Sequence, residues 1–225
     1  DIRDNWPDSF INLFPKILKP LSVFFLWPWR ILLKYSLNNS TKLMASSRLQ
    51  ADFARTYLKN KESDIKIFYI GDDIEEVNVQ EGKKANLNLL FVGTLTKARP
   101  LEVIINKLKE INDLSISLDV VGDGDLLNYY KKISKEVLNV TFHGRKIGNE
   151  LHAFIRNSDI LLAPYQDTGY GWSMPAKISS YIGFGRPIIT NIKNETKELL
   201  DQYNLGSIIE FNDLQQFKDS LEHWK

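Results

Sequence analysis

Glycines and cationic side chains occur together in two segments of the sequence, and each segment leads into a predicted helix. The first runs from Gly93 to Pro100. Gly93 lets the backbone approach a ligand closely, and Lys97 and Arg99 stand beside a helix N-terminus, whose free N–H groups and positive dipole end favour an anion. The segment therefore predicts a phosphate site, with a solvated basic loop as the alternative.

The second segment runs from Tyr165 to Lys177 and has one glycine on each side of an aromatic residue. Ser173 is placed to cap the next helix, and Pro175 falls at or near its first turn, where a missing N–H costs nothing. Lys177 lies in that first turn, although a lone cation there is mildly unfavourable. This misfit favours a function for Lys177, and the loop suits a diphosphate.

A third segment, Val121 to Asp125, combines glycines with acidic residues between a predicted strand and a predicted helix. It does not match G-x-G-x-x-G, and no acidic residue follows at the spacing of a dinucleotide site. A nicotinamide cofactor is therefore disfavoured. Because Asp and Gly are good turn formers, a structural turn is the favoured interpretation.

Composition disfavours several classes of function. The 225 residues suffice for one large domain or about one and a half. The 29 basic and 28 acidic side chains nearly cancel, which disfavours bulk nucleic-acid binding. The chain has no cysteine for thiol, disulfide or thiolate-metal chemistry, and its three histidines lack metal-pair spacing. We therefore expect no metal site and no cofactor.

From Leu87 onward, short apolar runs alternate with stretches of helical spacing. The predicted strands are Leu89–Val92, Ile116–Val121, Val140–Phe142, Ile160–Ala163, Ile188–Thr190 and Ile208–Ile209. The predicted helices are Leu101–Ile111, Leu126–Val137, Asn149–Arg156, Ala176–Phe184, Glu195–Gln202 and Leu214–Trp224. This α/β alternation predicts a Rossmann-like, doubly wound parallel sheet. Its ligands bind outside the carboxyl ends of the strands, where all three segments above are placed.

Before that domain, the pattern predicts a strand at Lys42–Ser46, a helix at Arg48–Leu58 and a strand at Ile65–Ile70. The polar run Asp72–Asn86, with five acidic residues, predicts a linker. We therefore predict a first domain at residues 1–75, a linker at 76–86 and a second domain at 87–225. The chain opens without a start methionine or a recognisable leader, so we expect a fragment of a longer protein.

The segment Ser9–Ser36 differs from the rest because it has seven aromatic residues, four basic residues and no acidic residue. Its longest apolar stretch, Leu21–Leu33, is too short and too interrupted to span a bilayer. Two interpretations stay open. The segment is either an amphipathic face in an anionic membrane interface, with Trp27 and Trp29 at headgroup depth, or the helical core of a truncated domain.

Six motifs, in order over about 130 residues, resemble the C-terminal, nucleotide-sugar-binding half of the GT-B glycosyltransferases of group 1, or family 4. They are Gly93-Thr94-Leu95 with Arg99 at the family's lysine position, Val121 to Gly124, Val140 to Gly144, Ser158-Asp159 through Pro164, Gly169 to Gly171, and Gly185 to Ile189. Each motif is weak alone, but the order of all six makes the resemblance strong.

The N-terminal part is similar to the acceptor-side domain of a bacterial subgroup that makes surface polysaccharides. Asp1 to Pro7 resembles its D-x-R-D-x-W-P element, and the strands predicted at Lys42–Ser46 and Ile65–Ile70 resemble its closing strands. Pro175 to Tyr181 is similar to the subgroup's P-x-K-x-x-E-Y motif. The resemblance thus implies that the remnant of a second Rossmann-like domain precedes the donor-binding domain.

The resemblance implies retaining transfer of a sugar from a UDP- or GDP-sugar, bound in an interdomain cleft, to a lipid-linked or saccharide acceptor. It implies a cytoplasmic protein, peripheral on the inner face of a bacterial membrane. Lys97, Arg99 and Lys177 would meet the diphosphate and stabilise the departing charge. The other donor-site candidates are Gly93, Thr94, Gly169, Tyr170, Gly171, Trp172, Ser173 and Ser180, with Phe142, Gly144 and Arg145 at the edge of the base. Arg3 and Asp4 are the acceptor-side candidates, and no residue is singled out as a catalytic base.

Two departures from the family pattern concern the donor site. Thr94 stands where the family has an arginine, and Thr168 and Ser180 stand where it has paired glutamates. Each lost hydrogen bond from a sugar or ribose hydroxyl to a carboxylate costs about 1.5–3 kcal/mol, which predicts reduced or altered donor recognition. Two alternatives to an active transferase stay open: a noncatalytic nucleotide-sugar-binding subunit, and a GT-B-fold nucleotide-sugar epimerase.

Overall fold

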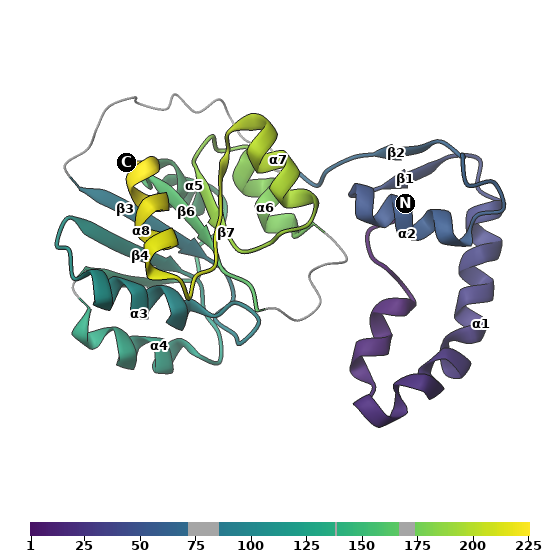
Figure 1. Cartoon of the computed structure of the whole chain (residues 1–225), viewed down its shortest axis with the longest axis horizontal. Helices are drawn as coiled ribbons and strands as arrows, with labels where there is room; N and C mark the ends of the chain where they lie inside the picture. Colours follow the sequence, from purple (N-terminus) through teal and green to yellow (C-terminus); the bar gives the residue numbers. More distant parts are fainter. Residues whose placement is uncertain (72–85, 138, 167–173) are drawn as a thin grey trace. The chain divides into compact units, whose positions relative to one another are not determined.

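The structure is a computed structural model, and it describes residues 1–71, 86–137, 139–166 and 174–225. The described residues form two compact units (Figure 1). Residues 1–70 and 174–176 belong to the first unit, and the other described residues belong to the second. Each unit has a hydrophobic core of its own. Residues 76–85 of the predicted linker lie outside the described residues.

The second unit is built on a six-stranded parallel sheet with the strand order β5-β4-β3-β6-β7-β8. Its strands are β3 (Leu87–Val92), β4 (Ile116–Val121), β5 (Val140–Gly144), β6 (Ile160–Ala163), β7 (Ile188–Thr190) and β8 (Gly206–Ile208). Parallel strands covered on both faces are nearly continuous in apolar residues, and β6 is buried along its whole length. The predicted fold class is therefore confirmed.

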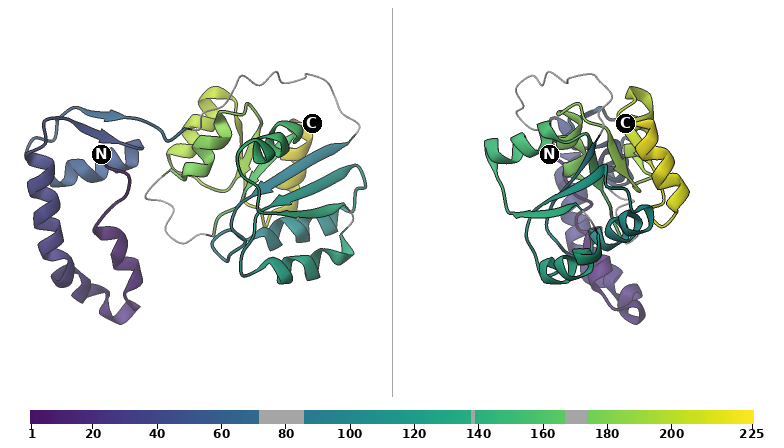
Figure 2. Two further views of the ribbon diagram at one scale, coloured as in Figure 1. Left: turned by 180° about the vertical axis from the view of Figure 1, so that it is seen from behind. Right: turned by 90° about the vertical axis from the view of Figure 1, so that its left-hand side faces the viewer.

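Helices cover both faces of this sheet because the chain reverses its direction of growth. It builds outward from β3 through β4 to β5, then returns to the other side of β3 for β6, β7 and β8. Right-handed crossovers then place the helices that connect β5 to β6, β6 to β7 and β7 to β8 on the opposite face. α3 (Leu101–Ile111), α4 (Leu127–Ile133) and α8 (Leu214–His223) cover one face, and α5 (Gly148–Asn157), α6 (Ala176–Ile182) and α7 (Glu195–Tyr203) cover the other (Figure 1, Figure 2).

The reversal takes place between the neighbouring strands β3 and β6. In open α/β sheets it leaves a crevice outside the carboxyl ends of the two strands, where ligands bind. The connection from β3 to α3 and the residues that follow β6 emerge at this crevice. They contact each other, since the Gln166 amide donates to the Ala98 carbonyl at 3.0 Å. The predicted phosphate-binding segments therefore start from adjacent points of the sheet.

The first unit is built on a two-stranded parallel sheet of β1 (Leu43–Ala45) and β2 (Ile65–Ile67), with α2 (Arg48–Tyr57) as their crossover. Two short 3-10 helices, η1 (Asp8–Leu13) and η2 (Lys16–Leu18), and the long α1 (Lys19–Asn38) precede β1. The Asp8 carboxylate accepts hydrogen bonds from Arg30 at 2.7 Å and Tyr57 at 2.9 Å. One half-buried carboxylate thus ties η1 to α1 and α2.

Most apolar side chains of α1 are exposed. Its buried residues are Ser22, Leu26 and Leu37, whereas Phe24 is 77% exposed and Trp27 is 62% exposed. The other exposed apolar residues of the helix are Leu21, Val23, Phe25, Trp29, Ile31, Leu32 and Tyr35. Together with Phe24 and Trp27 they form what we call the apolar face of α1. In the described part of the chain, no helix is both long and apolar enough to cross a membrane.

Most predicted elements differ from the observed ones by a few residues at an end, and three of them illustrate why. The strand predicted at Ile65–Ile70 ends at Ile67, because the three residues of β1 pair with it no further. The helix predicted at Leu126–Val137 is α4 followed by a 3-10 turn, η3 (Ser134–Glu136). There the Ser134 hydroxyl donates to the Lys131 carbonyl at 3.2 Å and competes with regular helical bonding. The last strand begins at Gly206, which pairs with Ile188.

The close approach of β3 and β4 at their carboxyl ends predicts that Gly122 tolerates no side chain. Its φ is +149°, and a Cβ there would lie on the Gly93 carbonyl group, 2.9 Å from its carbon. Gly122→Ala should lower the free energy of unfolding by about 3 kcal/mol, measured by urea denaturation. Gly144→Ala is the matched control, because its φ is +69° but no atom lies within 4 Å, and it should lose about 1 kcal/mol. Equal losses would contradict the packing argument.

Candidate functional site

A hollow of about 910 Å³ lies at the carboxyl ends of the strands in the second unit. The ends of β3, β4 and β5 and the first turn of α6 contribute its walls. It is lined by Val92, Gly93, Thr94, Arg99, Val121, Gly122, Asp123, Gly124, Asp125, Arg145, Lys146 and Lys177. The hollow therefore has four cationic and two acidic side chains in its lining, at the place where the topology predicts a ligand.

Arg99 and Lys177 come together at the backbone of Gly93. A Cβ placed on Gly93 would lie 2.9 Å from the Arg99 guanidinium and in still closer contact with the Lys177 ammonium. The glycine therefore makes room for both cations. The sequence predicts that these two side chains share one anion site, and the structure brings them to the same spot.

The Lys177 ammonium group is buried and has no hydrogen-bond partner among the described residues. It lies 5.6 Å from the centre of the Phe91 ring and 6.0 Å from that of Tyr181. Burial, with a further contribution from the positive charge of Arg99, lowers the pKa of Lys177 from its usual 10.5 to about 7. A buried cation beside a second cation is unfavourable unless an anion compensates both.

Tyr181 positions Lys177 in this arrangement. The two residues are four apart on α6 and therefore lie on the same face of the helix. The buried Tyr181 hydroxyl accepts a hydrogen bond from the Val92 amide at 3.2 Å, immediately before Gly93. Burial raises the pKa of Tyr181, so it remains neutral near pH 7. This hydrogen bond fixes α6 against the end of β3.

The segment Val121 to Asp125 is the structural turn that its composition predicts, and it also lines the hollow. The Gly93 amide donates to the Val121 carbonyl and the Leu95 amide donates to the Asp123 carbonyl, both at 2.9 Å. These bonds hold the loops after β3 and β4 side by side. The turn therefore fixes the position of Gly93 and places the carboxylates of Asp123 and Asp125 at the hollow.

Of the predicted donor-site residues, Gly93, Thr94, Arg99, Arg145 and Lys177 line the hollow. Four other predicted residues do not line the hollow. Lys97 is exposed, and Phe142 packs against the core from β5. The Gly144 carbonyl accepts from the Gly122 amide at 2.8 Å, and Ser180 is half-buried on α6. Residues 168–173, which include the other candidates Gly169, Tyr170, Gly171, Trp172 and Ser173, lie outside the described residues.

The acceptor-side candidates belong to the first unit and are both exposed. The Arg3 guanidinium pairs with the Asp1 carboxylate at 2.6 Å, and the Asp4 carboxylate accepts from the Asn5 amide at 2.7 Å. Their role stays a prediction.

The sequence analysis missed Tyr181, Asp125 and Lys146 as residues at or beside the hollow. The spacing of Lys177 and Tyr181 on one helix face was the available signal for Tyr181. For Lys146 no local signal existed, because it reaches the hollow only through the order of the strands. Asp125 belongs to the segment Val121 to Asp125, which we placed at the ligand-binding edge of the sheet but interpreted as a structural turn.

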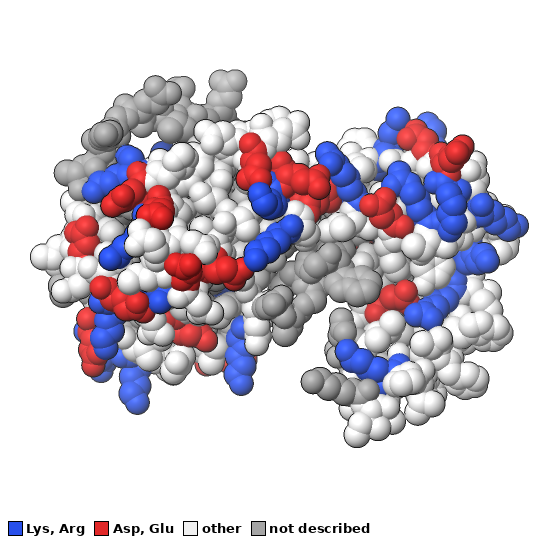
Figure 3. All heavy atoms as spheres, in the orientation of Figure 1, with Lys and Arg blue, Asp and Glu red and all other residues white. Residues whose placement is uncertain are grey.

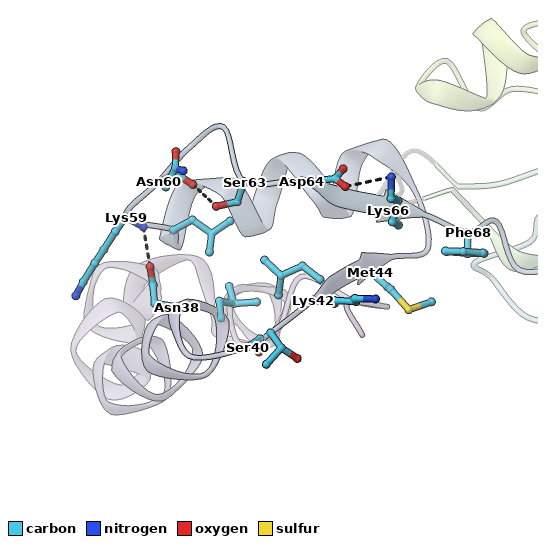
Figure 4. Close-up of a pocket in the computed structure, with 14 residues that line it drawn as sticks. Asn38, Ser40, Lys42, Met44, Lys59, Asn60, Ser63, Asp64, Lys66 and Phe68 are labelled. Atoms are coloured by element: carbon cyan, nitrogen blue, oxygen red, sulfur yellow. Dashed lines mark hydrogen bonds and ion pairs between the residues drawn. The ribbon is translucent and has the colours of Figure 1, made fainter.

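A second hollow, of about 750 Å³, lies in the first unit (Figure 4). Met44, Lys66 and Phe68 belong to its wall, together with the start of β1 and the loop before β2. Its lysines, Lys42, Lys59 and Lys66, are exposed, and Lys66 pairs with Asp64 at 3.1 Å. Among its described lining residues no buried polar side-chain atom lacks a partner. It is therefore the weaker candidate.

A family of known proteins matches the part of the chain that contains the first hollow. The family described as glycosyl transferases group 1 matches residues 86–224. The chain belongs to this family. The matched residues include every described residue that lines the hollow, so the predicted family is confirmed for the part of the chain that carries the site.

Two curated relatives of this group 1 chain are similar to it over part of their length. An uncharacterized glycosyltransferase of Methanocaldococcus jannaschii is 26% identical over 199 residues, which cover 85% of this chain and 52% of that protein. An uncharacterized 41.2 kDa protein in the cps region of Klebsiella pneumoniae is 25% identical over 150 residues, which cover 66% of this chain and 40% of that protein. The chain thus spans about half the length of these relatives.

Among solved structures, HepE of Anabaena, in complex with UDP and glucose, is similar with a TM-score of 0.57. It is 15% identical, and the match covers 86% of this chain and 57% of that one. At this identity the likeness shows a shared fold.

The burial of Lys177 predicts that its amine destabilises the ligand-free protein. Because its pKa is lowered on folding, the unfolded chain binds more protons between about pH 7 and 10.5, and stability rises with pH over that interval. Lys177→Met should therefore stabilise the protein by about 2 kcal/mol at or below pH 7, a gain that fades toward pH 10.

Thermal unfolding at pH 6, 8 and 9.5 measures this effect, and Lys131→Met is the matched control because Lys131 is exposed on α4. A loss of stability in Lys177→Met at pH 6 would show that the amine is compensated inside the protein.

Proposed function

We propose that the protein is a retaining glycosyltransferase, which moves a sugar from a UDP- or GDP-sugar to an acceptor hydroxyl. The observation that carries this proposal is the pair of cations, Arg99 and Lys177, that meet over Gly93, where the buried Lys177 ammonium has no hydrogen-bond partner among the described residues. Membership of group 1 glycosyltransferases supports it. The solved HepE complex contains UDP and glucose, which supports a nucleoside diphosphate donor.

In this mechanism the diphosphate binds across Gly93, where Arg99 and Lys177 neutralise it. An acceptor oxygen forms a bond to the anomeric carbon on the face from which the diphosphate leaves, so the configuration is retained. The bond from that carbon to the diphosphate oxygen breaks, and the hydroxyl proton passes to the departing diphosphate. The negative charge on the departing diphosphate grows as the bond breaks. Fixed cations in a partly dry site stabilise that charge more than water does, which lowers the barrier.

Recognition of the sugar is the less complete part of the site. Ser180 on α6 has no carboxylate for sugar or ribose hydroxyls, and Thr94 has no charge. Asp123 and Asp125 are the described carboxylates in the wall of the hollow. Among the described lining residues, the four cationic side chains that can meet a diphosphate outnumber the two carboxylates that can accept from hydroxyls. This favours one second candidate function, a noncatalytic nucleotide-sugar-binding subunit.

We propose that the acceptor is lipid-linked and that the reaction belongs to polysaccharide assembly. The relative from the cps region of Klebsiella pneumoniae supports such a context. The apolar face of α1 supports a lipid surface, because aromatic and aliphatic side chains at this density are unfavourable in water.

The charge of the first unit is complementary to an anionic membrane. Residues 1–70 carry 11 basic and six acidic side chains, whereas residues 71–225 carry 18 basic and 22 acidic ones. On the face shown in Figure 3, basic side chains outnumber acidic ones over residues 1–70. Lys19, Arg30 and Lys34 belong to α1 itself, which has no acidic residue. Cations beside an apolar face are the pattern of helices that lie in an anionic interface.

The diphosphate role of Arg99 predicts a selective loss of affinity. Arg99→Ala should weaken UDP or GDP binding about 10- to 100-fold and change binding of the bare nucleoside less than about twofold, measured by calorimetry. Lys97→Ala is the matched control, since Lys97 lies on the same loop but is exposed and does not line the hollow. It should leave both affinities within about twofold. Equal losses of nucleotide and nucleoside in Arg99→Ala would refute the phosphate role.

The same calorimetry, extended to UDP- and GDP-sugars, separates the two candidate functions when it is combined with a transfer assay on lipid-linked acceptors. Sugar transfer supports the enzyme, and binding without transfer by the complete protein supports the noncatalytic subunit. If no nucleotide or nucleotide sugar binds, both proposals fail.

The membrane role of α1 predicts loss of liposome binding when its tryptophans are removed. Trp27→Ser with Trp29→Ser should abolish sedimentation with vesicles that contain anionic lipid, while circular dichroism remains unchanged. Tyr129→Ser with Tyr203→Ser removes two exposed aromatic rings from the second unit and is the matched control. Undiminished sedimentation of the tryptophan variant would contradict the membrane proposal.

A further inference from the structure

We propose that Lys177 is neutral in a large fraction of the free protein and takes up a proton when a nucleoside diphosphate sugar binds. The inference rests on the proposed diphosphate site and adds a proton to its binding reaction. Donor binding then depends on pH through one named side chain.

The geometry makes a permanent charge on Lys177 unfavourable in the absence of a ligand. Its ammonium is buried, has no hydrogen-bond partner among the described residues and lies beside the Arg99 guanidinium at Gly93. The aromatic rings of Phe91 and Tyr181 offer only weak cation–π contacts, at 5.6 and 6.0 Å. Losing the proton removes both the desolvation penalty and the repulsion from Arg99.

Charged and titratable groups face Lys177 from each described element around it. Arg99 comes from the loop after β3, and the buried neutral Tyr181 lies one turn further along α6. The remaining charged residues that line the same hollow are Asp123 and Asp125 after β4, and Arg145 and Lys146 after β5. The Lys177 ammonium has no hydrogen-bond partner among the described residues, so neither aspartate is bonded to it. One carboxylate oxygen of Asp123 accepts from the Gly124 amide at 2.8 Å.

A diphosphate diester reverses this balance because it brings two negative charges to the spot where two cations repel. Its field favours the charged form of Lys177, so the neutral amine accepts a proton from solvent and donates it in a hydrogen bond to a phosphate oxygen. Since the pKa of Lys177 in the free protein is about 7, this uptake falls within the physiological range. Arg99 remains charged throughout and provides the initial attraction.

Calorimetry with UDP-glucose, in buffers that differ in ionisation enthalpy, measures the proton uptake directly. A nucleotide sugar is the probe because both its phosphates are diesters, whereas the terminal phosphate of free UDP titrates near pH 6. A group with a free pKa of about 7 predicts uptake of about 0.5 proton at pH 7 and about 0.9 at pH 8. Affinity should fall about fifty-fold between pH 7 and pH 9.

Lys177→Arg is the decisive variant, because a guanidinium keeps its charge and should bind UDP-glucose without proton uptake and with a flat pH profile. A second measurement uses the wild-type protein and so does not depend on whether a variant folds. When the lysine Cε signals are followed by NMR as the pH is changed, one of them should titrate near pH 7. UDP-glucose should move that titration upward by about three pH units, which the expected fifty-fold change in affinity requires.

The outcomes separate the inference from the function on which it rests. UDP-glucose binding without proton uptake, or uptake that persists in Lys177→Arg, overturns the inference and leaves the proposed function standing. If neither UDP-glucose nor any other UDP- or GDP-sugar binds, both are overturned.

Discussion

The proposed diphosphate site depends on two cations that repel each other beside a glycine. Arg99 and Lys177 meet over Gly93, and the buried Lys177 ammonium has no hydrogen-bond partner among the described residues. Folding alone gains nothing from this arrangement, since burial and repulsion both oppose the charge. An anion between them adds an attraction to each cation that offsets both penalties. The site is therefore unfavourable when empty and favourable when a diphosphate occupies it, which is what a site for a departing diphosphate requires.

The rest of the second unit keeps these two side chains in place. The reversal between β3 and β6 brings their loops to one crevice, and the hydrogen bond from the Val92 amide to Tyr181 holds α6 over the end of β3. The turn at Val121 to Asp125 supports Gly93 from the other side. Each of these contacts lies in the part of the chain that matches the group 1 glycosyltransferases. The first unit adds an apolar and net basic surface, and we propose that it contacts a membrane interface.

The alternation of apolar runs and helical spacing was enough to predict the fold, because strands buried on both faces differ from amphipathic helices in their hydrophobic period. Element ends were less predictable, since the end of β2 depends on the length of its partner and the end of α4 on one serine hydroxyl. For the site, the unfavourable position of Lys177 in a first helical turn was informative. The contribution of Lys146 depends on the order of the strands, which no local pattern predicts. Tyr181 had a local signal, its four-residue spacing from Lys177, and Asp125 lay in a segment that we interpreted only as a turn.

A crystal structure of the protein with bound UDP-glucose would show whether Arg99 and Lys177 together bind the diphosphate. We expect diphosphate oxygens within about 3 Å of both the Lys177 ammonium and the Arg99 guanidinium, above the backbone of Gly93. A diphosphate that binds elsewhere and contacts neither side chain would show that Arg99 and Lys177 do not form the donor site.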